Sequence, residues 1–303
     1  MESLDIAKVC ERIAVHRPYF AFSELKAVYG EAIMGKFSAE QSTGFELGPI
    51  SSAELGRHLA ILGSCAAAIG GPDQMTYYLA SKGRLKLLPN TDEVQKDPNG
   101  VAIATVTGRD RRTMTAEVLG HCGSLTAHLW CEYQVLSSEV FSRIFGGHHT
   151  GAIPRPDMSP YVTPVTFDVL SASIDRIVVR TSEVGPQSFA GHFDNYPSWP
   201  VAILADTFGR VRSTLLHNMI DRQTNYRVGY LNVDAFQLAP AAARLTFEVE
   251  CISSFPLLGR YVFSAKVRWN DKTIAAMESE VYASAGGPAN HMGTIQEEFE
   301  IKA

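Results

Sequence analysis

The sequence predicts an α+β protein made of two copies of one unit, in which a long helix is followed by a run of antiparallel strands. Strand-like and helix-like segments recur in the same order in both halves of the chain. A helix wrapped by a sheet should be apolar on most of its faces, and the stretch 59–69 of the first half has this composition. The copies match at residues separated by about 146 positions: Phe22 with Phe167, Gly44 with Gly191, Pro49 with Pro197, Tyr78 with Tyr226, and Val135 with Val281.

The repeat divides the chain into two domains joined by a linker. We expect an N-terminal domain over 1–145, which includes a short extension, and a C-terminal domain over 161–303. The stretch 146–160 between them is rich in glycine and proline, which is typical of a linker. It contains His148 and His149, which we expect to be solvated rather than bound to a metal.

The first copy begins after a short helix predicted within 1–16. A strand pair is expected over 22–37, and Ser51 and Glu54 have the spacing of a capping box, which predicts the start of the central helix. Gly70 and Gly71 are suited to end that helix. Four strands are predicted to follow it, over 76–88, 102–109, 112–122 and 124–136.

The second copy shows the same order. A strand pair is expected over 167–181, and Pro200 suits the first turn of a helix that runs to about 220. Apolar residues recur in this helix at three- and four-residue steps: Leu204, Phe208, Val211, Leu215 and Met219. Four strands are again predicted, over 226–238, 243–253, 258–269 and 272–283.

Composition excludes several classes of protein. Hydrophobic residues make up 46% of the chain and charged residues 19%, which is typical of a globular protein with a buried core. The net charge of −5 gives no support to nucleic-acid binding, and no apolar run is long enough for a membrane span. The N-terminus lacks signal-peptide features, and the five cysteines are widely spaced. We therefore expect a cytoplasmic protein that needs no cofactor or metal and binds neither nucleic acid nor membrane.

A motif within 189–206 points to a function. Six of its residues keep a fixed spacing: Gly191, His192, Phe193, Pro197, Pro200 and Asp206. This spacing resembles that of the β-hydroxyacyl-ACP dehydratases of fatty-acid synthesis, which have the hotdog fold. Three positions depart from the family pattern: Asp194, Asn195 and Val201.

The resemblance implies a fold and a substrate class. A hotdog wraps an antiparallel sheet round one long helix, so two copies in one chain predict a double hotdog, with two antiparallel sheets each wrapped round its own central helix. Pairing between the copies would cover one edge of each sheet, which allows either a monomer or a homodimer of double hotdogs. The implied substrate is an acyl thioester carried by an acyl carrier protein or by CoA.

The resemblance also implies roles for individual residues. His192 would be the general base, because neutral imidazole accepts a proton at physiological pH. The backbone N–H near Val201 would stabilise the developing negative charge. Gly191, Phe193, Pro197 and Val201 would form the substrate-binding part of the motif.

The acid partner of His192 is open at this point. In the family, the acid comes from the other hotdog, and aligning Pro49 with Pro197 sets His58 opposite Asp206, with Glu54 one turn earlier. Glu54 or His58 would then work with His192. Asp206 would belong to a second site that has no histidine, because Gly44-Phe45 stands there. Each of the three residues also has a structural interpretation: helix cap, satisfied core histidine and buried remnant.

Three functions are compatible with these residues. The first is a dehydratase of β-hydroxyacyl thioesters in fatty-acid or polyketide-type synthesis. The second is a hotdog acyl thioesterase, a class that typically uses a carboxylate on the helix. The third is a catalytically silent hotdog that binds acyl chains. His192 favours the first, whereas the degenerate first copy favours the third.

Overall fold

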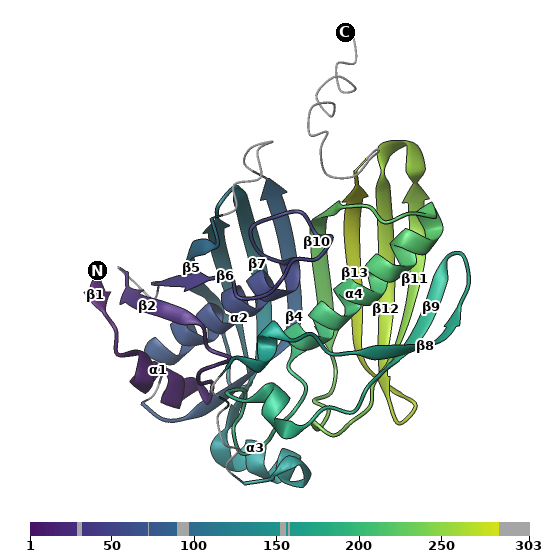
Figure 1. The fold of residues 1–303 in the computed structure, drawn as a ribbon. Helices are drawn as coiled ribbons and strands as arrows, with labels where there is room; N and C mark the ends of the chain where they lie inside the picture. The colour runs from purple at the N-terminus through teal and green to yellow at the C-terminus, as the bar shows by residue number, and fades with distance from the viewer. Residues whose placement is uncertain (29–31, 72, 90–96, 152–155, 157, 285–303) are drawn as a thin grey trace.

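A long antiparallel sheet curves behind two central helices, α2 (Ser52–Ile69) and α4 (Val201–Ile220), which pack against each other (Figure 1). The computed structural model describes residues 1–28, 32–71, 73–89, 97–151, 156 and 158–284. Among these residues, no helix is long and apolar enough to cross a membrane. A sheet wrapped round a buried helix, repeated twice, is the arrangement expected of a hotdog fold.

The first half follows the predicted order closely. Its central helix α2 begins one residue after the Ser51 cap, and almost every side of it is buried. Its elements are β1 (Glu2–Ser3), α1 (Ile6–Ile13), β2 (Phe22–Ala27), β3 (Ala32–Ser38), α2 (Ser52–Ile69), β4 (Thr76–Pro89), β5 (Asn99–Arg109), β6 (Thr113–Cys122) and β7 (Leu125–Ser137).

The second half repeats this order after a short helical connection. Its central helix α4 begins directly after Pro200, as the sequence predicts. Its elements are α3 (Ser138–Phe145), η1 (Gly146–His148), η2 (Pro160–Val162), β8 (Phe167–Ala172), β9 (Arg176–Thr181), η3 (Pro186–Phe189), α4 (Val201–Ile220), β10 (Tyr226–Ala235), β11 (Thr246–Phe255), η4 (Pro256–Leu258), β12 (Arg260–Trp269) and β13 (Lys272–Ala283).

The strands form one sheet rather than the two that the sequence predicts. Their order is β1-β2-β3-β5-β6-β7-β4-β10-β13-β12-β11-β9-β8, so the two halves run outward from the central pair β4–β10. This pair is antiparallel, and at it Arg84 Nη2 and Asp234 Oδ1 lie 2.6 Å apart. The sheet of each half has an edge strand, β4 or β10, whose outward N–H and C=O groups need hydrogen-bond partners. Pairing of these two edges joins the halves into one sheet. The hotdog fold stands, but two separate sheets are not observed.

The N-terminal extension pairs with the second half. Residues just after α1 form an isolated antiparallel bridge between Val15 and His192. His16 N donates to Gly191 O at 2.7 Å, and Phe193 N donates to Ala14 O at 3.3 Å. Residues of the N-terminal extension therefore hold the motif loop of the second half in place.

The predicted domain boundaries remain predictions. Residues 152–155 and 157 of the predicted linker, and 285–303 of the predicted C-terminal domain, lie outside the described residues. The beginning of the linker is not purely extended, because η1 (Gly146–His148) forms one turn of 3₁₀ helix.

Candidate functional site

Two cavities lie between the halves, and the repeat relates them. In each cavity, the loop that precedes one central helix faces the side of the other central helix. The larger, of about 620 Å³, contains His192 and is called the His192 cavity below. The smaller, of about 340 Å³, contains Asp206 and is called the Asp206 cavity.

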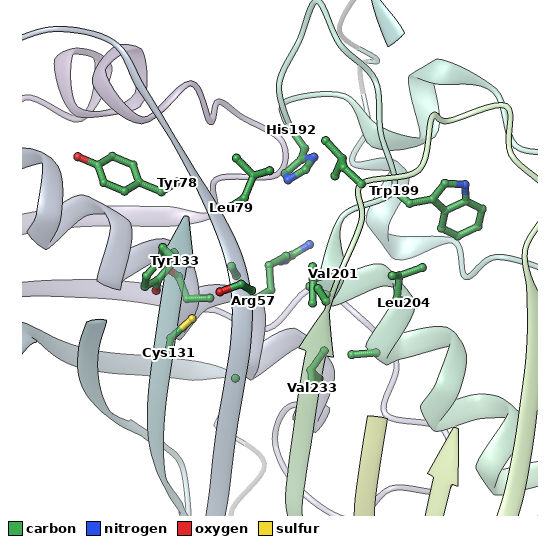
Figure 2. Close-up of a pocket in the computed structure, with 18 of the residues that line it drawn as sticks. Arg57, Tyr78, Leu79, Cys131, Tyr133, His192, Trp199, Val201, Leu204 and Val233 are labelled. Atoms are coloured by element: carbon green, nitrogen blue, oxygen red, sulfur yellow. The ribbon is translucent and has the colours of Figure 1, made fainter. Parts of the chain in front are cut away.

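The His192 cavity is mostly apolar. Its lining comes from α2, the first turn of α4, the motif loop and the strands β4, β7 and β10. Figure 2 shows His192, Arg57 and Val201 around this space, and they come from the motif loop, α2 and the start of α4 respectively. The lining residues include no Asp or Glu within the described part of the chain.

His192 is held as a neutral base in this cavity. Its side chain is 9% exposed, and burial lowers its pKa from 6.5 to about 3, although a hydrogen bond with the backbone of Ser198 acts in the opposite direction. Nδ1 is buried without a hydrogen-bond partner among the described residues. The ring packs edge-on against Tyr19, with centroids 4.9 Å apart. His192 lines the cavity, and a neutral imidazole with an unpaired nitrogen is a suitable proton acceptor.

The motif glycine and proline shape the loop rather than line the cavity. Gly191 has φ +85°, and a Cβ there would collide with the backbone of His16. Asp194 accepts a hydrogen bond from Gly191 N at 3.0 Å, so the side chain that replaces the family's proline closes the turn. Pro197 O accepts from Ala241 N at 2.9 Å. Of the four predicted substrate-binding residues, Phe193 and Val201 line the cavity.

The first turn of α4 has no side-chain cap. Its N-cap is Pro200, and Pro200 O accepts hydrogen bonds from the N–H groups of Ile203 and Leu204. The first N–H groups of a helix have no acceptor within the helix, so those of Val201 and Ala202 face outward from its end. Both residues line the His192 cavity. The helix therefore presents N–H donors and the positive end of its dipole to this space.

Arg57 of α2 also lines the His192 cavity, and the sequence did not single it out. It is the sixth residue of α2, as Asp206 is the sixth residue of α4. The alignment on Pro49 and Pro197 missed this equivalence, because α2 begins three residues after Pro49 whereas α4 begins four residues after Pro197. Counting from the start of each helix would have found it.

Glu54 and His58 do not lie beside His192. Neither residue lines either cavity. The Glu54 carboxylate points to the preceding loop, where it accepts hydrogen bonds from Glu40 N at 2.7 Å and Gln41 N at 3.2 Å. His58 is fully buried, and its ring stacks on Phe37 at 4.7 Å. The structure gives both residues structural surroundings rather than a place next to the candidate base.

Asp206 lines the other cavity, away from His192. Burial raises its pKa, and Arg210 acts in the opposite direction. Opposite it lie Gly44 and Phe45, which occupy the place that the motif loop takes in the His192 cavity. The start of α2 also faces this space, through Ser51 and its neighbours.

The first turn of α2 is capped by side chains, unlike that of α4. Glu46 accepts hydrogen bonds from Ser52 N at 2.6 Å and from Ser52 Oγ at 3.2 Å, and Ser51 Oγ accepts from Glu54 N. Burial raises the pKa of Glu46, and the guanidinium of Arg212, 3.8 Å away, opposes that shift. The helix end that faces the Asp206 cavity is thus already occupied.

Comparison with known proteins shows the fold. No family model matches the chain, and no curated protein matches it. A tesB protein of Mycobacterium avium subsp. paratuberculosis superposes with a TM-score of 0.58 and 9% identity over 86% of this chain and 96% of that one. TesB2, an acyl-CoA thioesterase II of Mycobacterium marinum, superposes with a TM-score of 0.55 and 12% identity, and the match covers 88% of this chain and 96% of that one.

A third solved structure names the fold. A conserved hot dog fold protein of unknown function from Alicyclobacillus acidocaldarius has a TM-score of 0.56 and 13% identity, and the match covers 90% of this chain and all of that one. At these identities the similarity shows a shared fold only. The chain therefore has a hotdog fold over nearly the full length of these proteins.

Proposed function

We propose that this protein hydrolyses acyl thioesters, with the acyl chain bound in the His192 cavity. The observation that carries the proposal is the lining of that cavity. It combines a neutral imidazole with an uncapped helix N-terminus, and it contains no carboxyl group within the described residues. The thioesterase is thus preferred to the dehydratase that the motif resembles.

The two reactions differ in their need for an acid. Dehydration expels hydroxide, and water has a pKa of roughly 15.7, so the departing group must receive a proton. Hydrolysis expels a thiolate, whose parent thiol has a pKa of about 8.5 and which leaves without prior protonation. Two polar groups of the lining, Tyr19 and Cys131, are poor proton donors, because burial raises the pKa of Tyr19 and raises that of Cys131 to about 12. The cavity thus contains the groups that hydrolysis requires.

The proposed reaction uses three groups of this chain. His192 Nδ1 removes a proton from a water molecule, and the resulting hydroxide attacks the thioester carbonyl. The oxyanion that forms accepts hydrogen bonds from the N–H groups of Val201 and Ala202. The intermediate collapses to the carboxylic acid and a thiolate, and the thiolate takes the proton from the imidazolium.

The comparisons support the same class by analogy. Two of the proteins with this fold are described as TesB proteins, one of them an acyl-CoA thioesterase. CoA is accordingly the carrier that we propose, in the cytoplasm. Hotdog thioesterases typically use a carboxylate on the helix; here Asp206 of α4 lies in the other cavity, and Glu54 of α2 lines neither cavity. The base that we propose is therefore His192.

The dehydratase is the second candidate, and one observation favours it. The Gly191-His192-Phe193 motif keeps the family's spacing to Pro197 and Pro200, and His192 reaches a cavity shared with the helix of the other half. A dehydratase would need a proton donor that binds together with the substrate.

One assay separates the two functions. The protein is incubated with octanoyl-CoA and with β-hydroxyoctanoyl-CoA, while free thiol and enoyl absorbance are followed in parallel. We expect free thiol from octanoyl-CoA and no enoyl product. Enoyl formation without thiol release would overturn the thioesterase in favour of the dehydratase. Absence of both products, with retained acyl-CoA binding, would favour the silent binding protein.

A further inference from the structure

Arg57 is a cation whose hydrogen-bonding groups are only partly used. Its side chain is 1% exposed, and Nη2 donates to Glu40. Nε and Nη1 are buried without an acceptor among the described residues. A buried polar group that lacks a partner costs free energy, more so when the group is charged. Since Arg57 lines the His192 cavity, a bound molecule is the natural source of the missing acceptor.

The guanidinium is fixed in place before any ligand arrives. Its Cζ lies 5.6 Å from the ring centroid of Tyr19 and 5.2 Å from that of Tyr161. These cation–π contacts and the Glu40 ion pair hold the group from several sides. The remaining donors therefore keep a defined position, as a specificity determinant requires.

The charges around Arg57 decide which acceptor fits. Glu40 and Glu54 both lie near the guanidinium, with Glu54 Oε1 at 3.7 Å from Nη2. Two carboxylates beside one cation leave no positive charge in excess, so a third anion would be repelled. A neutral oxygen is the acceptor that these charges allow.

The donors of arginine distinguish a carbonyl from a hydroxyl. Guanidinium only donates hydrogen bonds, and a carbonyl only accepts them. A hydroxyl also carries a hydrogen that needs its own acceptor, and the remainder of the cavity is mostly apolar. A carbonyl on the acyl chain is therefore the better match.

The position of the carbonyl follows from Tyr19. Its ring centroid lies 4.9 Å from that of His192 and 5.6 Å from Arg57 Cζ, so both groups contact the same aromatic ring and both line the His192 cavity. A thioester placed against His192 brings the first few carbons of its acyl chain to Arg57. We propose that the His192 cavity selects β-oxoacyl thioesters and that Arg57 binds the β-carbonyl. This inference rests on the proposed thioester chemistry.

The first test compares three substrates of equal chain length: octanoyl-, β-hydroxyoctanoyl- and β-oxooctanoyl-CoA. A hydrogen bond to a charged group corresponds to about 10- to 100-fold in affinity. We expect kcat/KM for thiol release to be at least about tenfold higher with the β-oxo substrate than with the other two. Equal values for the β-oxo and unsubstituted substrates, or for the β-oxo and β-hydroxy substrates, would overturn the inference.

Arg57→Met should remove the preference. Methionine retains an unbranched apolar stem but has no donor. Because the substitution leaves Glu40 without its partner, the double variant Arg57→Met/Glu40→Gln is measured beside it. Arg210→Met, in the Asp206 cavity, is the matched control and should keep the wild-type ratio. A β-oxo preference that persists without Arg57 would contradict the assignment.

A binding measurement separates this inference from the proposed function. The S-octyl and S-(3-oxooctyl) thioethers of CoA lack a scissile thioester, and the ketone of the second lies on the carbon equivalent to the β-carbon of the acyl chain. Their Kd values for the wild-type protein therefore report recognition alone. Tighter binding of the oxo analogue supports the inference even if no thiol is released, in which case the thioesterase proposal alone fails. Thiol release from the acyl-CoA substrates together with equal Kd values for the two analogues would overturn this inference and leave the thioesterase proposal standing. These measurements remain decisive if the Arg57 variants do not fold.

Discussion

The two central helices occupy equivalent places in the two halves, but the N–H groups of their first turns have different hydrogen-bond acceptors. Glu46 and Ser51 accept hydrogen bonds from the first N–H groups of α2, whereas no side chain caps α4. The capped helix faces a cavity that has a carboxyl group, and the uncapped helix faces a cavity that has a neutral imidazole. The two cavities are thus alike in position but differ in the helix end that faces them, and the end without a side-chain cap faces the His192 cavity.

The largest expected effect separates the two cavities directly. His192→Ala should lower kcat about 10²–10⁴-fold, because the general base is lost. Asp206→Asn is the matched change in the other cavity and should leave kcat within about threefold. Thiol release by both purified variants checks this, with circular dichroism as the control for folding. An essential Asp206 and a dispensable His192 would move the active site to the Asp206 cavity.

A proline at the first position of each helix compares the two helix ends. Proline is tolerated at this position and only removes its N–H. Val201→Pro should lower kcat about 10²-fold or more, since an oxyanion donor disappears. Ser52→Pro removes a donor that already binds Glu46 and should lower stability instead of kcat. Steady-state kinetics and urea denaturation measure the two effects, and equal kinetics in both variants would contradict the role of α4.

Removal of the α2 cap should affect folding rather than turnover. Glu46→Ala removes the carboxylate that lies 3.8 Å from Arg212 Nη2 and leaves Ser52 N without the acceptor it has in the wild type. Loss of one partner of a buried ion pair costs about 3 kcal/mol, which a shift of the urea midpoint would show. A large loss of kcat at unchanged stability would instead place the reaction at α2.

The smallest effect concerns pH. Burial lowers the pKa of His192 to about 3 in the folded protein, from 6.5 in an unfolded chain, so between these pH values the unfolded chain binds one proton more. The contribution of His192 to the free energy of unfolding therefore keeps its full value above pH 6.5 and decreases as the pH falls from 6.5 towards 3. Between pH 7 and pH 5 the loss is about 2 kcal/mol. Urea denaturation at both values should show a smaller loss in His192→Ala than in the wild type.

Much of the fold could be predicted because its signals are local. The Ser51–Glu54 capping spacing and Pro200 placed both helix starts within one residue. The resemblance predicted that the copies pair along one sheet edge, but it did not identify β4 and β10 as the paired strands, because they are far apart in sequence and no local pattern specifies their pairing. A hydrophobic pattern sets which face of a strand is buried but does not identify the strand's neighbour.

The site was predictable only where the motif covers it. His192 and Val201 were identified from the motif, but Arg57 was not, since an arginine in a helix usually reaches solvent. Glu46 lies in a loop without periodicity, so its contact with the start of α2 had no sequence signal. Glu54 and His58 were selected by an alignment that was one residue out of register.

Different elements hold the two loops that precede the central helices. The turn after α1 bonds to the His192 loop, whereas Phe45 and Leu47 bond to Tyr226 at the start of β10. In evolutionary terms, a substitution near Val15 acts on the contacts of the His192 loop and not on the hydrogen bonds between Phe45, Leu47 and Tyr226. Natural selection can therefore act on the two halves separately, although they share one sheet. A duplicated gene whose copies are supported in different ways can specialise one copy while the other retains a structural role.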